Sequence, residues 1–259
     1  MHPRLLPDPG IDRYPPVRAA SSLPKQDTRE HTLEELLATN QELELFVRTL
    51  SHDLRSPIHG VNGWARALEE DCEAELSEVG RQHLKQLREQ TRHLASIVDG
   101  LYQLLQIGKS AIHPEPLDLS AMAHEIWRRL RSSDPERDAE LIIADRMDLL
   151  ADVVLTRVIV TQLLDNAWKF TRNRAVSRIE VGQRMDGDVS QVFVKDNGAG
   201  YAAGRAQKLF LPFQRLHRQN DFPGLGLGLA MAAKAARRQG GDLWAESVEG
   251  EGATFFLRL

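Results

Sequence analysis

The chain has 259 residues, of which 42% are hydrophobic and 27% charged, and its formal net charge is -4. This composition predicts a globular protein of about two domains, and the mild acidity argues against general nucleic-acid binding, which requires a strongly basic domain. No apolar stretch reaches the roughly 18 residues that a membrane span requires. With one cysteine, Cys72, the chain cannot form an intrachain disulfide. We therefore expect a cytoplasmic protein without a membrane span.

The first part of the chain divides into a leader and a helical hairpin. Residues 1–31 are rich in proline and lack apolar periodicity, which predicts a disordered leader. Residues 32–112 are predicted to form two antiparallel amphipathic helices joined by a short acidic loop. Along the second helix, two apolar sets alternate at heptad spacing: Leu84, Thr91, Val98 and Leu105 in one, and Leu87, Leu94 and Leu101 in the other. A single hairpin cannot cover both seams, so we predict a homodimer whose hairpins form a four-helix bundle.

The first helix contains the heptapeptide SHDLRSP, which begins at residue 51. Phe46, Leu50 and Leu54 recur every four residues and are expected to form the buried stripe of this helix. His52 is then turned roughly 200° away from that stripe, toward water. The next residue, Asp53, is suited to orient the imidazole. A solvated histidine is the more common explanation for such a residue, so the rest of the chain has to decide its role.

Residues 113–259 have the pattern of a second domain, in which helices and strands are mixed. Pro114 and Pro116 predict a linker at its start. Helices are predicted at residues 119–131, 153–172 and 228–239, and strands at 141–143, 177–184, 189–195, 242–247 and 254–257. Such a mixture predicts an α/β sandwich with one mixed sheet. The fold class of the whole chain is therefore α+β, with a helical hairpin followed by this sandwich.

The segment DNAWKFT, late in the predicted helix 153–172, carries side chains suited to a nucleotide. Asn166 offers a neutral amide oxygen to a hard cation such as Mg²⁺, and Lys169, one turn further on, can meet phosphate charge. Phe170 is suited to cover a base. A surface pair of Asn and Lys with a core Phe explains the same residues equally well.

Two glycine-containing segments point in the same direction. Asp196 follows a predicted strand and can accept a hydrogen bond from an exocyclic amine, while Gly198 and Gly200 let the backbone approach a flat heterocycle. An ordinary Asp-Asn-Gly turn is the alternative. The segment GLGLGL, with glycines at 224, 226 and 228, opens a helix and leaves backbone N–H groups free for phosphate oxygens. Between these segments, residues 201–223 form a long irregular connection typical of a lid, which Phe210 and Phe213 are expected to anchor.

Taken together, these segments resemble the sequence boxes of bacterial two-component sensor histidine kinases. From about residue 40 onward, the chain carries SHDLRSP like the phosphoacceptor box, DNAWKFT like the N box, DNGAG like the adenine-binding box, FLPF like the lid box and GLGLGL like the phosphate-binding box. All five stand in the family's order, which is a highly specific match. The runs FQRLH and GEGATF are most similar to kinases that follow phytochrome or PAS sensors. The resemblance implies a HisKA-type hairpin over residues 32–112 and a Bergerat-type ATP-binding domain over residues 113–259.

The resemblance also implies a role for each matched residue, with ATP and Mg²⁺ as cofactors. His52 would be the phosphoacceptor and Asp53 the acid that polarises it. Asn166 would hold Mg²⁺, together with Gln162, which stands where the family usually has Asn. The other nucleotide contacts would come from Lys169 and Arg215 to phosphate, Phe170 and Asp196 to the base, Gly198 and Gly200 for its approach, and Gly224, Gly226 and Gly228 around the phosphates.

The implied function is that of a histidine autokinase that passes its phosphoryl group to an aspartate in the receiver domain of a response regulator. The alternative is a kinase-like scaffold that dimerises and binds a receiver without useful transfer. Ser56 stands where many relatives have Thr or Asn, so phosphatase activity is left open. Because only the leader precedes the hairpin, we expect the signal to come from a separate sensor protein.

Overall fold

The computed structural model describes residues 25–72, 74–109, 111–187, 189–216, 222 and 224–259. Residues 44–259 form one compact unit, and the described residues before Glu44 belong to the start of helix α1 (Lys25–Cys72). Most of the predicted leader, residues 1–24, lies outside the described residues. No described helix is both long and apolar enough to cross a membrane.

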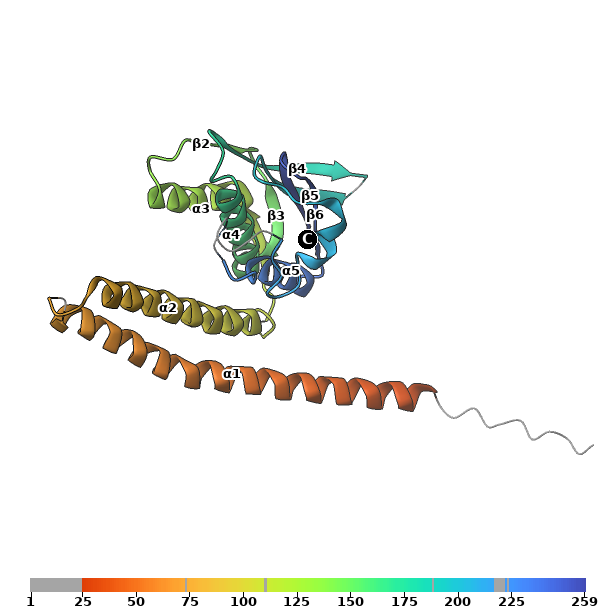
Figure 1. Ribbon diagram of the computed structural model, residues 1–259. Helices are drawn as coiled ribbons and strands as arrows, with labels where there is room; N and C mark the ends of the chain where they lie inside the picture. Colours follow the sequence, from red (N-terminus) through yellow and green to blue (C-terminus); the bar gives the residue numbers. More distant parts are fainter. Residues whose placement is uncertain (1–24, 73, 110, 188, 217–221, 223) are drawn as a thin grey trace, which may run out of the picture. The chain divides into compact units, whose positions relative to one another are not determined.

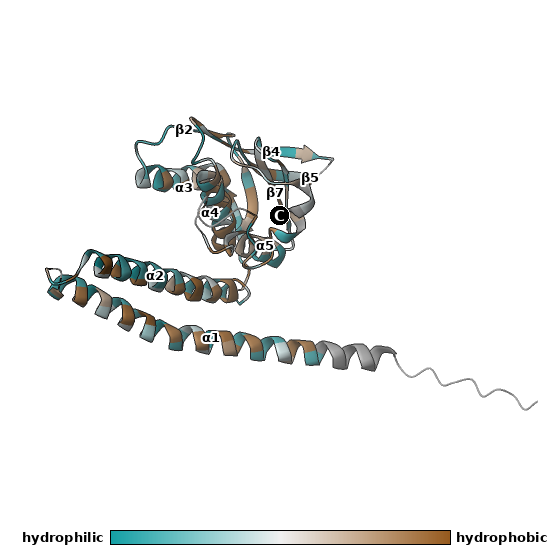
Figure 2. Ribbon diagram, in the orientation of Figure 1, coloured by the Kyte–Doolittle hydropathy of each residue, from teal (hydrophilic) through white to brown (hydrophobic). Residues whose placement is uncertain are grey.

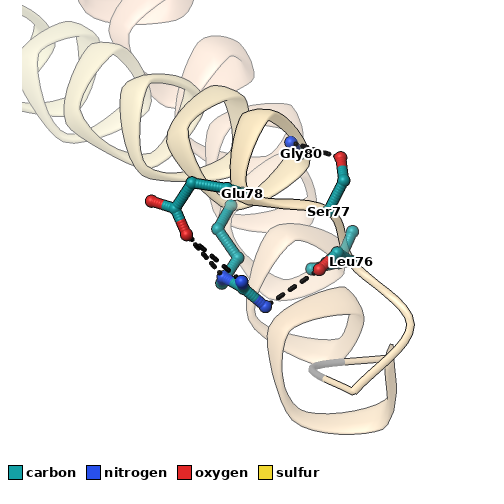
Figure 3. Close-up of polar contacts among 5 residues, drawn as sticks. Leu76, Ser77, Glu78 and Gly80 are labelled. Atoms are coloured by element: carbon teal, nitrogen blue, oxygen red, sulfur yellow. Dashed lines mark hydrogen bonds and ion pairs between the residues drawn. The ribbon is translucent and has the colours of Figure 1, made fainter.

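The hairpin consists of α1 and α2 (Glu78–Gln106) (Figure 1). Helix α2 begins at Ser77, whose hydroxyl accepts a hydrogen bond from the Gly80 N–H at 3.1 Å (Figure 3). In the same turn, Arg81 donates to the Glu78 carboxylate and, at 2.8 Å, to the Leu76 carbonyl oxygen. This side-chain cap satisfies a backbone donor at the helix start and fixes the point where the chain reverses.

The two helices of the hairpin bury one side and leave a second apolar side exposed. The residues buried between them are Ser51, Ile58 and Ala65 in α1, and Leu84, Thr91 and Val98 in α2. Arg55 links the helices through the Asp99 carboxylate at 2.9 Å. Apolar residues therefore recur on more than one side of α1 and α2 (Figure 2).

The predicted buried stripe of α1 is wrong for the single chain. Phe46, Leu50 and Leu54 are exposed, and the smaller side chains Ser51 and Ala65 are buried instead. In α2, Leu84, Thr91 and Val98 of one predicted set are buried and Leu105 is half-buried, whereas Leu87 and Leu94 of the other set are exposed. The prediction is wrong because α1 carries two apolar faces. Only the face with Ser51, Ile58 and Ala65 packs against α2 in the single chain.

The second domain is built on a five-stranded mixed sheet with the strand order β2-β4-β5-β7-β6. Its strands are β2 (Ala139–Ile143), β4 (Ser177–Asp186), β5 (Val189–Asp196), β6 (Asp242–Val248) and β7 (Gly252–Arg258). Strand β2 is parallel to β4, and the other neighbours are antiparallel. This confirms the predicted mixed sheet.

Three helices cover one face of this sheet: α3 (Leu119–Ser133), α4 (Val153–Phe170) and α5 (Gly228–Arg238) (Figure 1). Asp118 caps α3 by accepting from the Ala121 N–H at 2.8 Å, and Asp152 caps α4 by accepting from the Leu155 N–H at 2.9 Å. The core lies between helices and sheet, and its fully buried members include Ile159, Leu164 and Ile179. The helices begin where their predicted ranges begin.

The predicted linker at Pro114 and Pro116 is wrong, because both residues lie in a strand. Strand β1 (Pro114–Asp118) pairs antiparallel with β3 (Asp148–Asp152) in a separate two-stranded sheet, and neither strand was predicted. A two-stranded sheet consists only of edge strands, where proline's missing N–H can face away from the ladder. Proline therefore gave a misleading signal at this position.

Candidate active site

His52 lies on α1 with its side chain 85% exposed, as predicted. Its Nδ1 atom lies 3.1 Å from Oδ1 of Asp53, which is within hydrogen-bond distance. When Nδ1 carries the proton and donates it to this carboxylate, Nε2 keeps a free lone pair. Arg55 is held by Asp99, and Pro57 lies inside the helix. The His52 imidazole is therefore open to solvent and lies beside a carboxylate that can orient it.

A cavity of about 470 Å³ is lined mainly by residues of the second domain, together with Ser96, Asp99, Gly100 and Gln103 of α2. Its volume is within the range of roughly 300 to 1,000 Å³ that is usual for ligand pockets. It brings together side chains of α4, the end of β5, the connection that follows and the start of α5. The predicted residues that line it are Gln162, Asn166, Lys169, Phe170, Asp196, Gly200, Arg215, Gly224, Gly226 and Gly228. His52, Asp53 and Gly198 are not among the lining residues.

Asp196 ends strand β5 and is only 4% exposed. Burial raises the pKa of this carboxyl to about 6, against the opposing effect of backbone hydrogen bonds from Gly198 and Ala253. The Gly198 N–H donates to Asp196 Oδ1 at 2.8 Å. A Cβ at Gly198 would lie 2.7 Å from the carbonyl oxygen of Phe170, so only glycine fits there. Gly198 therefore does not line the cavity but lets its backbone pack closely against the backbone of Phe170.

The loop after Asp196 is held by the side chain of Arg174, which the sequence did not identify as a site residue. Arg174 donates to the carbonyl oxygens of Asn197 at 2.7 Å, Gly198 at 2.9 Å, and Gly250. Gly200 has a φ of 59°, and a Cβ there would collide with the carbonyl oxygen of Val248. No motif or spacing identifies Arg174, because its partners are backbone atoms distant in sequence.

Lys169 lies in the same cavity with its Nζ atom 4.2 Å from the centre of the Phe170 ring. Burial and the nearby charge of Arg215 lower the pKa of Lys169 to about 8, while Asp165 acts in the opposite direction. Phe170 packs against Phe222, with the ring centres 5.0 Å apart. A partly desolvated cation beside an aromatic surface is suited to bind an anionic group attached to a ring.

The described part of the predicted lid contacts the glycine box. The Phe213 N–H donates to the Gly226 carbonyl oxygen at 2.9 Å, and Arg215 donates to the Phe222 carbonyl oxygen at 2.7 Å. Phe210 packs against the core, which confirms one predicted anchor, whereas Phe213 is exposed, so the other prediction is wrong. Residues 217–221 and 223 of this stretch lie outside the described residues.

Gln162 and Asn166 stand one turn apart on α4 and both line the cavity. The Gln162 Oε1 atom lies where a Cβ of Gly228 would collide with it, so this amide oxygen is next to the glycine box. Among the described residues, no cluster of three or more His, Cys, Asp or Glu side chains is placed to hold a metal ion. The side chains available as metal ligands are the amide oxygens of Gln162 and Asn166. Such oxygens suit a hard cation whose remaining ligands come from phosphates and water.

Comparisons with known proteins find family matches for both the hairpin and the second domain. The sequence model described as "His Kinase A (phospho-acceptor) domain" matches residues 42–109. The model described as "Histidine kinase-, DNA gyrase B-, and HSP90-like ATPase" matches residues 151–259. The first range lies in the hairpin and includes His52, and the second covers most of the domain that lines the cavity.

Among the curated relatives, cyanobacterial phytochrome B of Nostoc is 30% identical over 240 residues, 92% of this chain and 32% of that protein. The methanogenesis regulatory histidine kinase FilI of Methanothrix harundinacea is 29% identical over 231 residues, 89% of this chain and 26% of the relative. The chain thus spans a minor part of the length of both relatives.

Among solved structures, full-length ShkA in complex with AMPPNP matches with a TM-score of 0.60 at 27% identity, covering 82% of this chain and 44% of that one. The Acinetobacter baumannii histidine kinase AdeS shares the fold, with a TM-score of 0.54 at 20% identity over 80% of this chain and 96% of that one. With a phosphoacceptor domain and an ATPase domain both matched, in the order that full kinases have them, the chain belongs to the two-component sensor histidine kinases.

Proposed function

We propose that this protein is an ATP-dependent autokinase that phosphorylates His52 and passes the phosphoryl group to a receiver-domain aspartate of a response regulator. The observation that supports this most strongly is the cavity, which gathers a buried carboxylate, a desolvated lysine and a glycine box from three separate sequence segments. This combination accounts for a base, a triphosphate and a cation at once. A water-exposed histidine, with Nδ1 within hydrogen-bond distance of the Asp53 carboxylate, supplies the acceptor.

Within the cavity, the residues divide the nucleotide between them. Asp196 accepts from the exocyclic amine of adenine, and Phe170 covers the base. Lys169, Arg215 and the backbone N–H groups at Gly224, Gly226 and Gly228 bind the phosphate oxygens. Asn166 and Gln162 hold Mg²⁺, which when bound neutralises part of the triphosphate charge.

The transfer step requires an in-line approach of the His52 imidazole to the γ-phosphorus of ATP. A bond forms between the imidazole nitrogen and phosphorus, and the bond from phosphorus to the oxygen that bridges the β- and γ-phosphates breaks, which releases ADP. Asp53 holds the proton on Nδ1, so Nε2 is the attacking atom. The group then moves to an aspartate oxygen of the receiver, and His52 regains its lone pair.

Homodimerisation belongs to the same proposal. Leu87 and Leu94 of α2 are 47% and 45% exposed in the single chain, although they repeat at heptad spacing. Two hairpins that pack these stripes together would remove them from water and form a four-helix bundle. A dimer also allows the ATP of one protomer to reach either His52.

The decisive experiment incubates the protein with γ-labelled ATP and Mg²⁺ and measures label that is lost in acid and retained in base. We expect such label on the wild type and none on His52→Gln. His59→Gln, a second exposed histidine on α1, is the matched control and should retain the label. If a folded wild-type protein binds ATP but takes up no label, the autokinase proposal fails and the scaffold alternative takes its place.

A further inference from the structure

Arg174 lies between α4 and β4, and its exposed side chain reaches the backbone of two other segments. Its Nε atom donates to the Asn197 carbonyl oxygen at 2.7 Å, and its Nη2 atom donates to the carbonyl oxygens of Gly198, at 2.9 Å, and Gly250. Asn197 and Gly198 follow β5, whereas Gly250 lies between β6 and β7. One guanidinium therefore joins two loops at the same end of the sheet.

The first of these bonds fixes the peptide unit between Asn197 and Gly198. Its carbonyl oxygen accepts from Arg174, and its N–H, which belongs to Gly198, donates to Oδ1 of Asp196 at 2.8 Å. No peptide bond among the described residues is cis, and the C=O and N–H groups of a planar trans peptide point in opposite directions. Holding the carbonyl oxygen on one side therefore aims the N–H at the Asp196 carboxylate on the other.

The next peptide unit, between Gly198 and Ala199, is held in the same way. Its carbonyl oxygen accepts from Arg174, and its N–H donates to the Phe170 carbonyl oxygen at 3.1 Å. Phe170 and Asp196 both line the cavity and are the residues assigned to the base. Arg174 thus acts on both of them through two consecutive peptide units, although it does not itself line the cavity.

An arginine that only closes a surface turn is the simpler explanation for these contacts. The turn is joined to the loop in another way as well, because the Gly250 N–H donates to the Ala199 carbonyl oxygen at 2.8 Å. The effect of Arg174 is then greatest on the two peptide units that lead to the cavity. Burial raises the pKa of Asp196 to about 6, and the positive charge of Arg174 is one of the effects that oppose this rise.

We propose that Arg174 is a positioning residue for the adenine end of the cavity, which directs two peptide N–H groups at Asp196 and Phe170 and thereby sets the affinity for the base. This inference rests on the proposed function, because it requires that the cavity binds ATP through these residues. The phosphates are assigned to other residues of the cavity, which Arg174 does not hold. Its effect on the base should therefore be separable from any effect on the phosphates.

The test measures the affinities of ATP and ADP, each with Mg²⁺, for Arg174→Ala and Arg174→Lys by calorimetry. Because ATP and ADP share the base and differ only in the phosphates, Arg174→Ala should reduce both affinities by the same factor, about 10-fold. Arg174→Lys keeps the charge but lacks the planar fork that holds two carbonyl oxygens at once, so it should still lose at least about 3-fold. Arg172→Ala, which removes another exposed positive charge from the same loop, is the matched control and should leave both affinities unchanged.

Wild-type affinity for ATP in a folded Arg174→Ala overturns the inference, because the arginine would then serve only the surface turn. A larger loss for ATP than for ADP also overturns it, since the effect would lie at the phosphates. Full affinity in Arg174→Lys does the same, because a point charge would then suffice. Thermal unfolding without nucleotide shows which variants are folded, and Arg174→Lys decides the outcome if Arg174→Ala is not.

Asp196→Asn separates this inference from the proposed function. If Asp196→Asn weakens ATP binding while both Arg174 variants bind ATP as the wild type does, only the positioning role fails. If the wild-type protein does not bind ATP, the proposed function fails and the positioning role fails with it.

Discussion

The hairpin and the cavity place their reactive groups in opposite environments. His52 is 85% exposed, and its hydrogen-bond partner is the carboxylate of Asp53, the next residue in the sequence. Asp196 is 4% exposed and sits among backbone donors from two separate segments, with its pKa raised to about 6 by burial. One site is formed by a single helix, and the other by the packing of a whole domain.

This difference follows from what each site has to do. A phosphoacceptor must be reached first by a nucleotide and then by a receiver, so burial would block it. A nucleotide site must distinguish one base from another, which requires polar groups that are desolvated and held in place. We therefore expect small substitutions to be tolerated on the hairpin and to be severe in the cavity.

The largest contrast is expected between two glycine-to-alanine substitutions. Gly200→Ala should abolish ATP binding and destabilise the domain by roughly 3 kcal/mol or more, because Gly200 has a φ of 59° and its Cβ would collide with the Val248 carbonyl. Gly60→Ala on α1 meets no atom and should stabilise the helix by up to about 1 kcal/mol. Thermal unfolding and ATP titration of both variants test this, and wild-type affinity in Gly200→Ala would contradict the contrast.

A second contrast concerns charge inside the cavity. Asp196→Asn should reduce the affinity for ATP about 100-fold, because the neutral amide oxygen accepts a weaker hydrogen bond from the adenine amine than a buried carboxylate does. The same substitution should stabilise the nucleotide-free protein at pH 7. The folded-state pKa of about 6 lies above the unfolded value of 3.8, so the wild type loses stability as the pH rises through this window, by about 3 kcal/mol.

The stability gain of Asp196→Asn should therefore shrink as the pH falls toward 4, where the wild-type carboxyl is protonated in the folded state and about half protonated in the unfolded state. Asp145→Asn, an exposed aspartate of the same domain, is the matched control and should change neither ATP affinity nor the pH profile. Chemical unfolding at several pH values measures both variants. A stability gain that is equal at pH 4 and pH 7 would show that the buried charge is not its cause.

On the hairpin, an effect on assembly is expected where two chains meet. Replacing the exposed Leu87 and Leu94 together by Glu should weaken the homodimer at least about tenfold while leaving the fold of each chain intact, because these side chains do not contribute to its buried seam. Lys85→Glu, on the polar side of α2, is the control. Sedimentation at several concentrations decides the outcome, and an unchanged dimer would place the interface elsewhere.

Sequence reasoning succeeded where function restricts local chemistry. The glycines at 224, 226 and 228 and the acid at 196 are short-range signals, and the fold brings them to one cavity. It failed where tertiary context decides. The prolines of β1 looked like a linker, because edge pairing with β3 is not visible in a five-residue window. Arg174 was missed because its partners are residues about 20 to 80 positions away, a separation at which pattern carries no information.

The smallest predicted effect is a fraction of a proton exchanged on nucleotide binding, and its sign distinguishes Lys169 from Asp196. Burial and Arg215 lower the pKa of Lys169 to about 8, so about half of the lysines are neutral at pH 8 before nucleotide binds. A bound triphosphate favours the charged form, so binding at pH 8 should take up as much as about half a proton. Near pH 6, the adenine amine instead favours ionised Asp196, so binding should release protons from this carboxyl.

Calorimetric titrations in buffers of different ionisation enthalpy give the number of protons exchanged on binding. Lys169→Arg keeps the positive charge but does not titrate in this range, so it should abolish the uptake at pH 8 and leave the release near pH 6 intact. Asp196→Asn, measured at saturating nucleotide because it binds more weakly, should abolish the release near pH 6 and leave the uptake at pH 8 intact. If the uptake at pH 8 persists in Lys169→Arg, the proton is bound by the nucleotide rather than by Lys169. Lys169 would then not exchange a proton when nucleotide binds.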